Sequence, residues 1–92
     1  MKDETLIRIM VYEIREKHPD AVRFNPTPKD IKSILLYMQT RKYDKIMYMY
    51  GYKFLLKILE LFEDVENYEE CFQIVEQIRK HNNLINDNIP TK

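Results

Sequence analysis

The stretch from Ile46 to Phe62 constrains the fold more than any other part of the sequence. Its only charged residues are Lys53, Lys57 and Glu60. A helix that is apolar on nearly every side has to be covered by neighbouring structure on several of them. We therefore expect a single helix over about residues 45–63, either at the centre of the domain or as part of a partner interface.

Two residues mark features of this expected helix. Asp44 precedes its first residue and is suited to cap it. Gly51 lies mid-helix, where it costs about 1 kcal/mol relative to alanine. Such a glycine indicates a close crossing with another helix or a kink.

Helical periodicity also dominates the rest of the chain, and strand-like alternation does not persist. Three further helices are expected over about residues 3–17, from Pro28 to the neighbourhood of Arg41 and Lys42, and over about residues 68–82. The predicted fold class is all-α, a compact bundle or array of four helices with the third helix central. We expect residues 1–82 to form a single helical domain, and residues 83–92 to be a flexible Asn-rich tail.

Local signals set the ends of these helices. His18–Pro19 stops the first helix, because the residue before a proline disfavours helical backbone. Thr27 is a good N-cap for the second helix, and Pro28 then takes the first helical position. Asn67 followed by Glu70 is typical of a capping box at the start of the fourth helix.

Apolar residues at helical spacing predict the buried faces. They are Leu6, Ile7, Met10 and Ile14 (widened by Ile9 and Val11) in the first helix, Ile31, Ile34, Leu35 and Met38 in the second, and Tyr68, Cys71, Phe72, Val75 and Ile78 in the fourth. Val22 and Phe24 are expected to hold the intervening proline-rich loop against the core.

The composition argues against enzymatic chemistry. One cysteine excludes a disulfide framework and a multi-cysteine zinc site, and one glycine excludes a glycine-rich phosphate loop. His18 and His81 have no metal-ligand spacing. Cys71 lies about 15 Å along the same helix from His81 and is expected to be a buried small hydrophobe. We expect no catalytic residues, no metal and no cofactor.

The setting of the chain is also suggested by its composition. The three charges between residues 46 and 62 argue against a membrane helix, and a lone cysteine favours the cytoplasm. Ile, Lys, Asn and Tyr make up 34 of 92 residues, and all four use A/T-rich codons. A phage, a mobile element or a low-GC bacterium would fit such usage.

Charge is unevenly distributed although the net charge is zero. Residues 29–57 carry seven cations and two anions, a net +5, and residues 58–92 carry three cations and eight anions, a net −5. Cations interleaved with tyrosines suit a nucleic-acid backbone. The residues that would bind nucleic acid in this alternative are Lys29, Lys32, Arg41, Lys42 and Lys45.

The methionines and tyrosines around residues 47–52 favour a different function. These residue types are enriched at protein interfaces, although they also pack in cores. We expect a small non-enzymatic protein-interaction module, such as an adaptor, an inhibitor or a structural subunit, whose partner is another protein or a second copy in a homodimer. The predicted interface residues are Lys45, Tyr48, Met49, Tyr52, Lys53 and Lys57.

Residues 56–82 carry an acidic turn followed by Tyr68, Glu69, Glu70 and, further on, Gln77, Ile78 and Arg79. This stretch resembles the helical hairpin of the UVR motif, an antiparallel helix pair of excision-repair subunits and some chaperone-linked adaptors. Cys71 and Phe72 stand where that family usually has alanines. The resemblance implies docking onto another protein and no catalysis.

Overall fold

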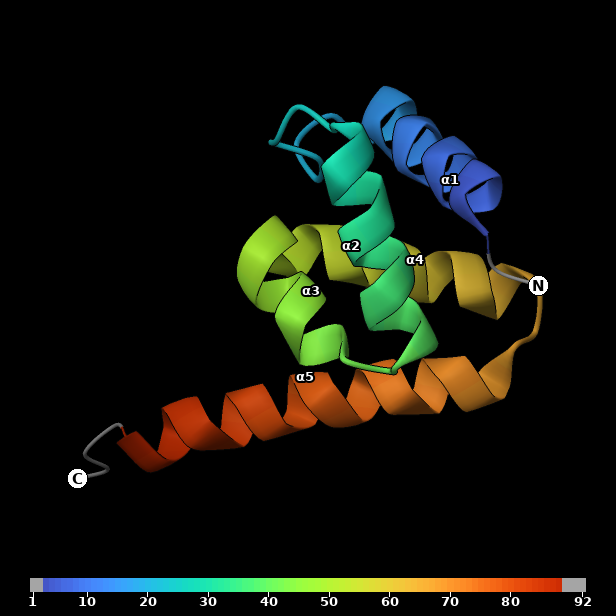
Figure 1. The fold of residues 1–92 in the computed structure, drawn as a ribbon. Helices are drawn as coiled ribbons and strands as arrows, with labels where there is room; N and C mark the ends of the chain where they lie inside the picture. Colours follow the sequence, from blue (N-terminus) through green and yellow to red (C-terminus); the bar gives the residue numbers. More distant parts are fainter. Residues whose placement is uncertain (1–2, 89–92) are drawn as a thin grey trace.

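The computed structural model describes the backbone of residues 3–88 and the side chains of residues 3–82, and it is built from helices (Figure 1). The helices are α1 (Glu4–Lys17), α2 (Pro28–Gln39), α3 (Tyr43–Tyr50), α4 (Tyr52–Asp64) and α5 (Tyr68–Asn88). No strand occurs within residues 3–88. The predicted all-α class is confirmed, but the expected number of four helices is wrong, because the expected third helix is two helices.

The first two helices begin and end where local sequence signals place them. The side chain of Asp3 caps α1 by accepting a hydrogen bond from the amide of Leu6. Thr27 and Asp30 form a reciprocal capping box at the start of α2, where Pro28 takes the first position. These caps satisfy amides that have no partner inside the helix.

The break between α3 and α4 lies at Gly51, where we predicted a close crossing or a kink in one continuous helix. Gly51 has φ 106° and ψ 152°, a conformation that side chains with a Cβ rarely adopt. Its amide donates to the carbonyl of Met47, and its own carbonyl accepts from the amide of Leu55. Gly51 therefore closes α3 and opens α4. No heavy atom lies within 4 Å of where its Cβ would be, so backbone conformation and not close packing requires the glycine.

The start of α3 also differs from the expectation. The helix begins at Tyr43 with Lys42 at the N-cap, and no side chain caps it. Asp44, the predicted cap, lies inside the first turn. The preceding turn explains the earlier start, because it delivers Tyr43 directly into the core.

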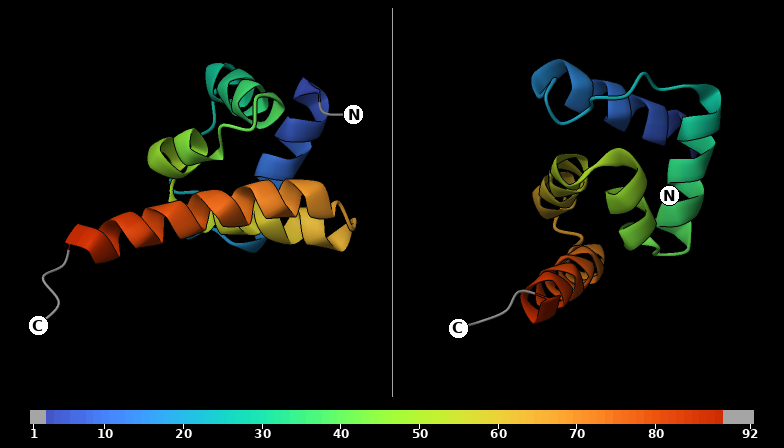
Figure 2. Two further views of the ribbon diagram at one scale, coloured as in Figure 1. Left: turned by 90° about the horizontal axis from the view of Figure 1, so that it is seen from below. Right: turned by 90° about the vertical axis from the view of Figure 1, so that its left-hand side faces the viewer.

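A tight turn joins α4 to α5. Glu66 adopts φ 59°, its amide donates to the carbonyl of Glu63, and the amide of Asn67 donates to the carbonyl of Phe62. This pattern is a Schellman motif, which satisfies the last carbonyls of a helix and reverses the chain. The result is an antiparallel pair in which α5 lies beside α4 (Figure 2).

The fourth predicted helix is longer than expected. Helix α5 continues to Asn88, so residues 83–88, which we expected in the flexible tail, are helical. The remaining part of that prediction, residues 89–92, lies outside the described residues. Figure 1 shows the C-terminal half of α5 extending past the other helices, in keeping with overall dimensions of 48 × 27 × 22 Å.

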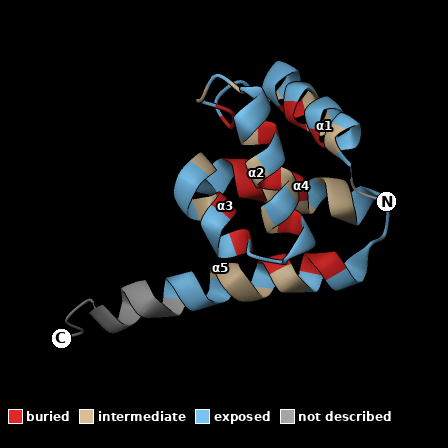
Figure 3. Ribbon diagram, in the orientation of Figure 1, coloured by how far each residue is buried: buried red, intermediate tan, exposed pale blue. Residues whose placement is uncertain are grey.

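The core lies between α2, α3, α4 and the inner faces of α1 and α5 (Figure 3). Its fully buried larger side chains are Tyr43, Phe54, Ile34, Met38, Ile46, Leu55, Ile58, Ile74 and Val11. Phe24 joins this core from the loop after α1, with its ring 4.8 Å from that of Tyr50 and 5.5 Å from that of Phe54. Val22 is buried as well, which confirms that these two loop residues hold the loop in place.

Two predicted buried faces are partly wrong. On α1, Leu6 and Ile9 are exposed, and the buried residues are Ile7, Val11 and Ile14. On α5, Tyr68, Phe72 and Val75 are exposed, whereas Cys71 and Ile74 are buried. In both helices the apolar stripe is wider than the strip that the neighbouring helices cover. The sequence pattern alone therefore does not show which residues of the stripe are buried.

The arrangement also revises which helix is central. Helix α3 contacts α2, α4 and α5, and α4 packs against α3 and α5. The two halves of the expected central helix therefore share that position. Across the described part of the chain, no helix combines the length and apolar character needed to cross a membrane.

Candidate functional site

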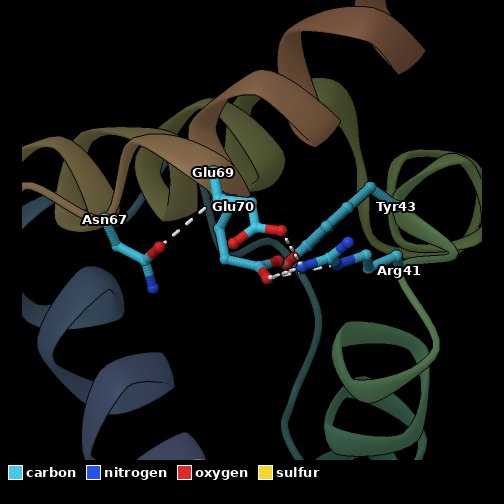
Figure 4. Close-up of polar contacts among 5 residues, drawn as sticks. All are labelled: Arg41, Tyr43, Asn67, Glu69 and Glu70. Carbon is cyan, nitrogen blue, oxygen red and sulfur yellow. Dashed lines mark hydrogen bonds and ion pairs between the residues drawn. The ribbon is translucent and has the colours of Figure 1, made fainter.

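The one buried charged side chain among the described residues, that of Glu70, lies where the turn after α2 meets the start of α5 (Figure 4). Arg41 has φ 56°, its amide donates to the carbonyl of Met38, and the amide of Lys42 donates to that of Tyr37. This is a second Schellman motif, with a non-glycine residue in the left-handed position. The turn directs the Arg41 side chain toward the first turn of α5.

Glu70 is the centre of this polar cluster. Its carboxylate accepts hydrogen bonds from Nε and Nη2 of Arg41 at 3.3 and 3.2 Å, and a short one from the hydroxyl of Tyr43. Nη2 of Arg41 also lies 3.1 Å from Oε2 of Glu69. Hydrogen bonding to Glu69 and the charge of Glu70 raise the pKa of Arg41, and burial together with Glu70 raises the pKa of Tyr43 well above its usual range.

The predicted capping box at the start of α5 is therefore only half formed. The side chain of Asn67 accepts from the amide of Glu70 at 3.5 Å. The amide of Asn67 donates to Phe62, and the Glu70 carboxylate binds Arg41 and Tyr43. Glu70 thus links three helices, and no described buried side-chain nitrogen or oxygen is left without a partner. The cluster is suited to holding the fold together.

A second group of tyrosines lies at the opposite end of α3 and remains open to solvent. We call Met47, Tyr48, Met49, Tyr52 and Lys53, which surround Gly51, the corner surface. Tyr48 is 89% exposed, and Met49 and Tyr52 are exposed as well. The break at Gly51 turns the chain here, so side chains from α3 and α4 point outward around one protruding corner.

Two hollows flank the corner surface. The first has a volume of about 480 Å³ and lies between the corner and the outer half of α5. Its lining residues are Asp44, Met47, Tyr48, Tyr52, Gln77, Lys80 and His81. The second, of about 600 Å³, lies between the corner and the loop after α1, where Arg23 and Phe24 contribute to the wall. Tyr48 and Tyr52 line both hollows, so they form the ridge between them.

Most of the predicted interface residues gather at this corner. Tyr48, Met49, Tyr52 and Lys53 line the second hollow, where Nζ of Lys53 lies 3.3 Å from the carboxylate of Asp20. That contact lowers the pKa of Asp20. The exposed Lys45 lies one helical turn before Tyr48 and Met49, on the same side of α3.

Lys57 lies one helical turn after Lys53 on α4 but lines a different hollow. It pairs with Glu60 at 3.1 Å and lines a smaller hollow between α4 and the end of α1, together with Glu13 and His18. We grouped Lys57 with Lys45 on the expectation of one continuous helix over about residues 45–63. The break at Gly51 places these two lysines on different helices.

The residues of the nucleic-acid alternative do not form one continuous basic group. Lys29 and Lys32 lie in the first turns of α2, and Arg41 and Lys42 follow its last residue, about 18 Å further along the helix axis. Arg41 is compensated by two carboxylates. Lys45 lies on α3, one helical turn before the corner surface.

Several residues of the hollows were missing from the predicted site. Gln77, Lys80 and His81 recur at helical spacing on α5, but only the packing of α5 against α3 brings them to the corner. Cys71 is buried as expected, its thiol faces the carbonyl of Leu59 at 4.0 Å, and burial raises its pKa. Among the described residues, no three His, Cys, Asp or Glu side chains form a group that would hold a metal ion.

Comparison of the chain with protein-family models found no match, and neither did comparison with curated proteins or with solved structures. The resemblance of residues 56–82 to the UVR hairpin stays a prediction. The function is therefore inferred from the chain's own residues.

Proposed function

We propose that this chain is a small non-enzymatic protein-interaction module that docks its partner through the corner surface. The observation that carries the proposal is the exposure of Tyr48, a large aromatic side chain at the ridge between two hollows. Tyrosine is enriched among the residues that dominate binding energy at protein interfaces, and methionine is enriched there as a flexible residue that adapts to the partner.

The charges at the corner favour an acidic partner. The first hollow carries Lys80 and His81 on its α5 side, and Lys45 lies close by on α3. The second carries Arg23. Asp44 and Asp20 are the carboxylates among the lining residues, and Asp20 is already paired with Lys53. A segment that offers an apolar or aromatic side chain flanked by carboxylates complements this surface.

Nucleic acid fits the geometry less well. The basic residues expected to bind it are split between the two ends of α2, and Arg41 is engaged with Glu69 and Glu70. A phosphate backbone needs a continuous basic track, and affinity for it falls steeply with salt. The apolar centre of the corner surface favours a protein instead.

The proposal is tested by selecting ligands for the full chain from a displayed library of random peptides. We expect the enriched peptides to combine acidic residues with an aromatic or large apolar residue. Tyr48→Ala should abolish their binding, whereas Tyr12→Ala, which alters an exposed tyrosine on α1, should leave it unchanged.

A parallel measurement with single-stranded and duplex oligonucleotides completes the test. We expect no binding at moderate ionic strength. Selected peptides that bind Tyr48→Ala and the unaltered chain equally well, or oligonucleotides that bind tightly and lose affinity steeply with salt, would overturn the proposal.

A further inference from the structure

We propose that the first hollow of the corner surface receives the turn between α4 and α5 of a second copy of this chain. This inference rests on the proposed function, because it uses the same corner as a docking site, and it names the partner. The inference rests on three observations: the apolar hollow, the lysines beside it, and an exposed apolar and acidic turn at the other end of α4.

The two surfaces lie at opposite ends of α4 (Figure 1). Tyr52 and Lys53 are in the first turn of this helix, at the corner, and Glu63 and Asp64 are in its last turn. The helix spans about 20 Å between them. One chain therefore cannot place its own turn in its own hollow, whereas a second copy can supply it.

The turn presents the chemistry that the hollow lacks. Val65 is 70% exposed and Tyr68 is 65% exposed, so both are available to enter an apolar cavity. Glu63, Asp64 and Glu66 are exposed around them, and within the described residues no ion pair joins any of the three to a cation.

Two acids of this turn, Glu63 and Asp64, lie at a helix end that does not favour them. The C-terminal end of a helix carries a partial negative charge and favours lysine or arginine. The last turn of α4 instead holds Glu63 and Asp64 and no basic residue. A cationic docking surface on another molecule would give these two carboxylates the partners that their own helix does not provide.

The hollow matches the turn in charge and in character. Met47, Tyr48 and Tyr52 supply its apolar lining. Lys80 supplies its cation, beside His81 and Asp44. Within the described part of the chain, neither Lys45 nor Lys80 takes part in an ion pair. Docking would place Val65 or Tyr68 against the apolar lining and the acids of the turn beside the free lysines.

Charge reversal of each surface separately provides the test. Variant one carries Lys45→Glu and Lys80→Glu, and variant two carries Glu63→Lys and Asp64→Lys. Sedimentation velocity of the unaltered chain should show species heavier than the 11.3 kDa monomer as concentration rises, with weaker association at high salt. The association of each variant alone should be weaker by at least about a hundredfold, because like charges then face each other.

Mixing the two variants should restore association. The acidic hollow of variant one then meets the basic turn of variant two, and the two unaltered surfaces also match. The double variant Lys29→Glu and Lys32→Glu makes the same change in net charge as variant one, away from both surfaces, and should associate like the unaltered chain. Urea unfolding of each variant verifies that it is folded; variant two should be at least as stable as the unaltered chain.

The outcomes separate this inference from the proposed function. A chain that is monomeric at all concentrations overturns the inference, and the proposed function still stands if Tyr48 is required for peptide binding. Association that survives both reversals, or that the mixture fails to restore, also overturns the inference. Loss of Tyr48-dependent peptide binding overturns the proposed function whatever the oligomeric state.

Discussion

The two ends of α3 use the same residue types for opposite purposes. Tyr43, at the start of the helix, is fully buried, and its hydroxyl donates to the Glu70 carboxylate. Tyr48, five residues later, is 89% exposed, and the described residues give it no hydrogen bond. Tyr43 directly follows Arg41 and Lys42, and Tyr48 lies three residues after Lys45. The difference is that Glu70 of α5 reaches the first end, whereas no acid among the described side chains of α5 binds the hydroxyl at the second.

This difference teaches that a basic and aromatic segment need not have one role. Where a carboxylate from elsewhere in the fold compensates the cation and accepts from the hydroxyl, the group stabilises the chain. Where no such carboxylate arrives, the same residues remain available to a partner. Substitutions at the two ends should therefore give opposite results.

The largest expected contrast is between Tyr43→Ala and Tyr48→Ala. Loss of the buried ring at position 43 leaves a cavity and removes a hydrogen bond from Glu70, so the free energy of unfolding should fall by about 3–5 kcal/mol. The exposed ring at position 48 should contribute less than about 0.5 kcal/mol. Urea unfolding followed by circular dichroism measures both, and similar losses at the two positions would contradict the assignment of their roles.

The next contrast compares two neighbouring acids of α5. Glu70→Ala leaves the buried Tyr43 hydroxyl without its acceptor and Arg41 without its main partner, so it should cost about 3 kcal/mol. Glu69→Ala removes only an exposed ion pair to Arg41 and should cost less than about 1 kcal/mol. Glu70→Gln, which can still accept from Tyr43, should lie between them. Equal losses for the two alanine variants would show that Glu70 does not organise the cluster.

Substitutions at Gly51 test why the chain breaks between α3 and α4. Gly51→Ala should cost about 1–3 kcal/mol, because a Cβ is unfavourable at φ 106° although the space around it is open. A chain assembled by ligation with D-alanine at this position should keep the unaltered stability, because a D-residue accepts positive φ. If the L- and D-alanine chains lose equal stability, the glycine serves another purpose than its backbone conformation.

The smallest expected effect concerns Tyr50, beside the exposed end, whose hydroxyl lies 3.1 Å from Oδ1 of Asp30. Burial and this hydrogen bond raise the pKa of Tyr50 from 10.0 to about 12. The folded chain therefore holds this proton more tightly than the unfolded chain does. The resulting stabilisation is complete below pH 10 and is lost as the pH rises toward 12, by about 1–2 kcal/mol when solvent screening is allowed for.

Tyr50→Phe isolates this contribution, since it keeps the ring contacts with Phe24 and Phe54. The unaltered chain should be more stable than the variant near neutral pH by about 1 kcal/mol and should lose that advantage above pH 10. Unfolding curves at several alkaline pH values measure the difference. A difference that stays constant with pH would contradict the hydrogen bond to Asp30.

Local signals in the sequence predict some of this fold well. Thr27 with Pro28 starts α2, and His18–Pro19 ends α1, because each signal acts on backbone groups within a few residues. The loop contacts of Val22 and Phe24 follow from apolar residues in a polar segment. These features need no knowledge of which helices meet.

Features that depend on helix meeting helix could not be predicted in this way. The partners Arg41 and Glu70 are 29 residues apart, and nothing near either residue identifies the other. Gly51 indicates a crossing or a kink, but the full break into two helices is not predicted, because the apolar pattern continues on both sides of it. Its reason is tertiary, since Ile46 before the break and Phe54 after it are both fully buried in one core.

The candidate site shows the same limit. Tyr48, Met49 and Tyr52 are recognisable from residue type, because methionines and tyrosines exceed what the core needs. Lys80 and His81 were not predicted, since their approach to the corner depends on how α5 lies along α3. Lys57 was grouped with Lys45 because one unbroken helix would carry both, whereas the structure places them on α4 and α3.

The buried thiol between α4 and α5 has a practical consequence. Cys71 is the only cysteine of the chain, and it faces the carbonyl of Leu59 across the hairpin. A reagent that reacts with thiols reaches it only when the two helices separate or the chain unfolds. The rate at which Cys71 is modified in native buffer therefore measures how often this hairpin opens, with no engineered residue required.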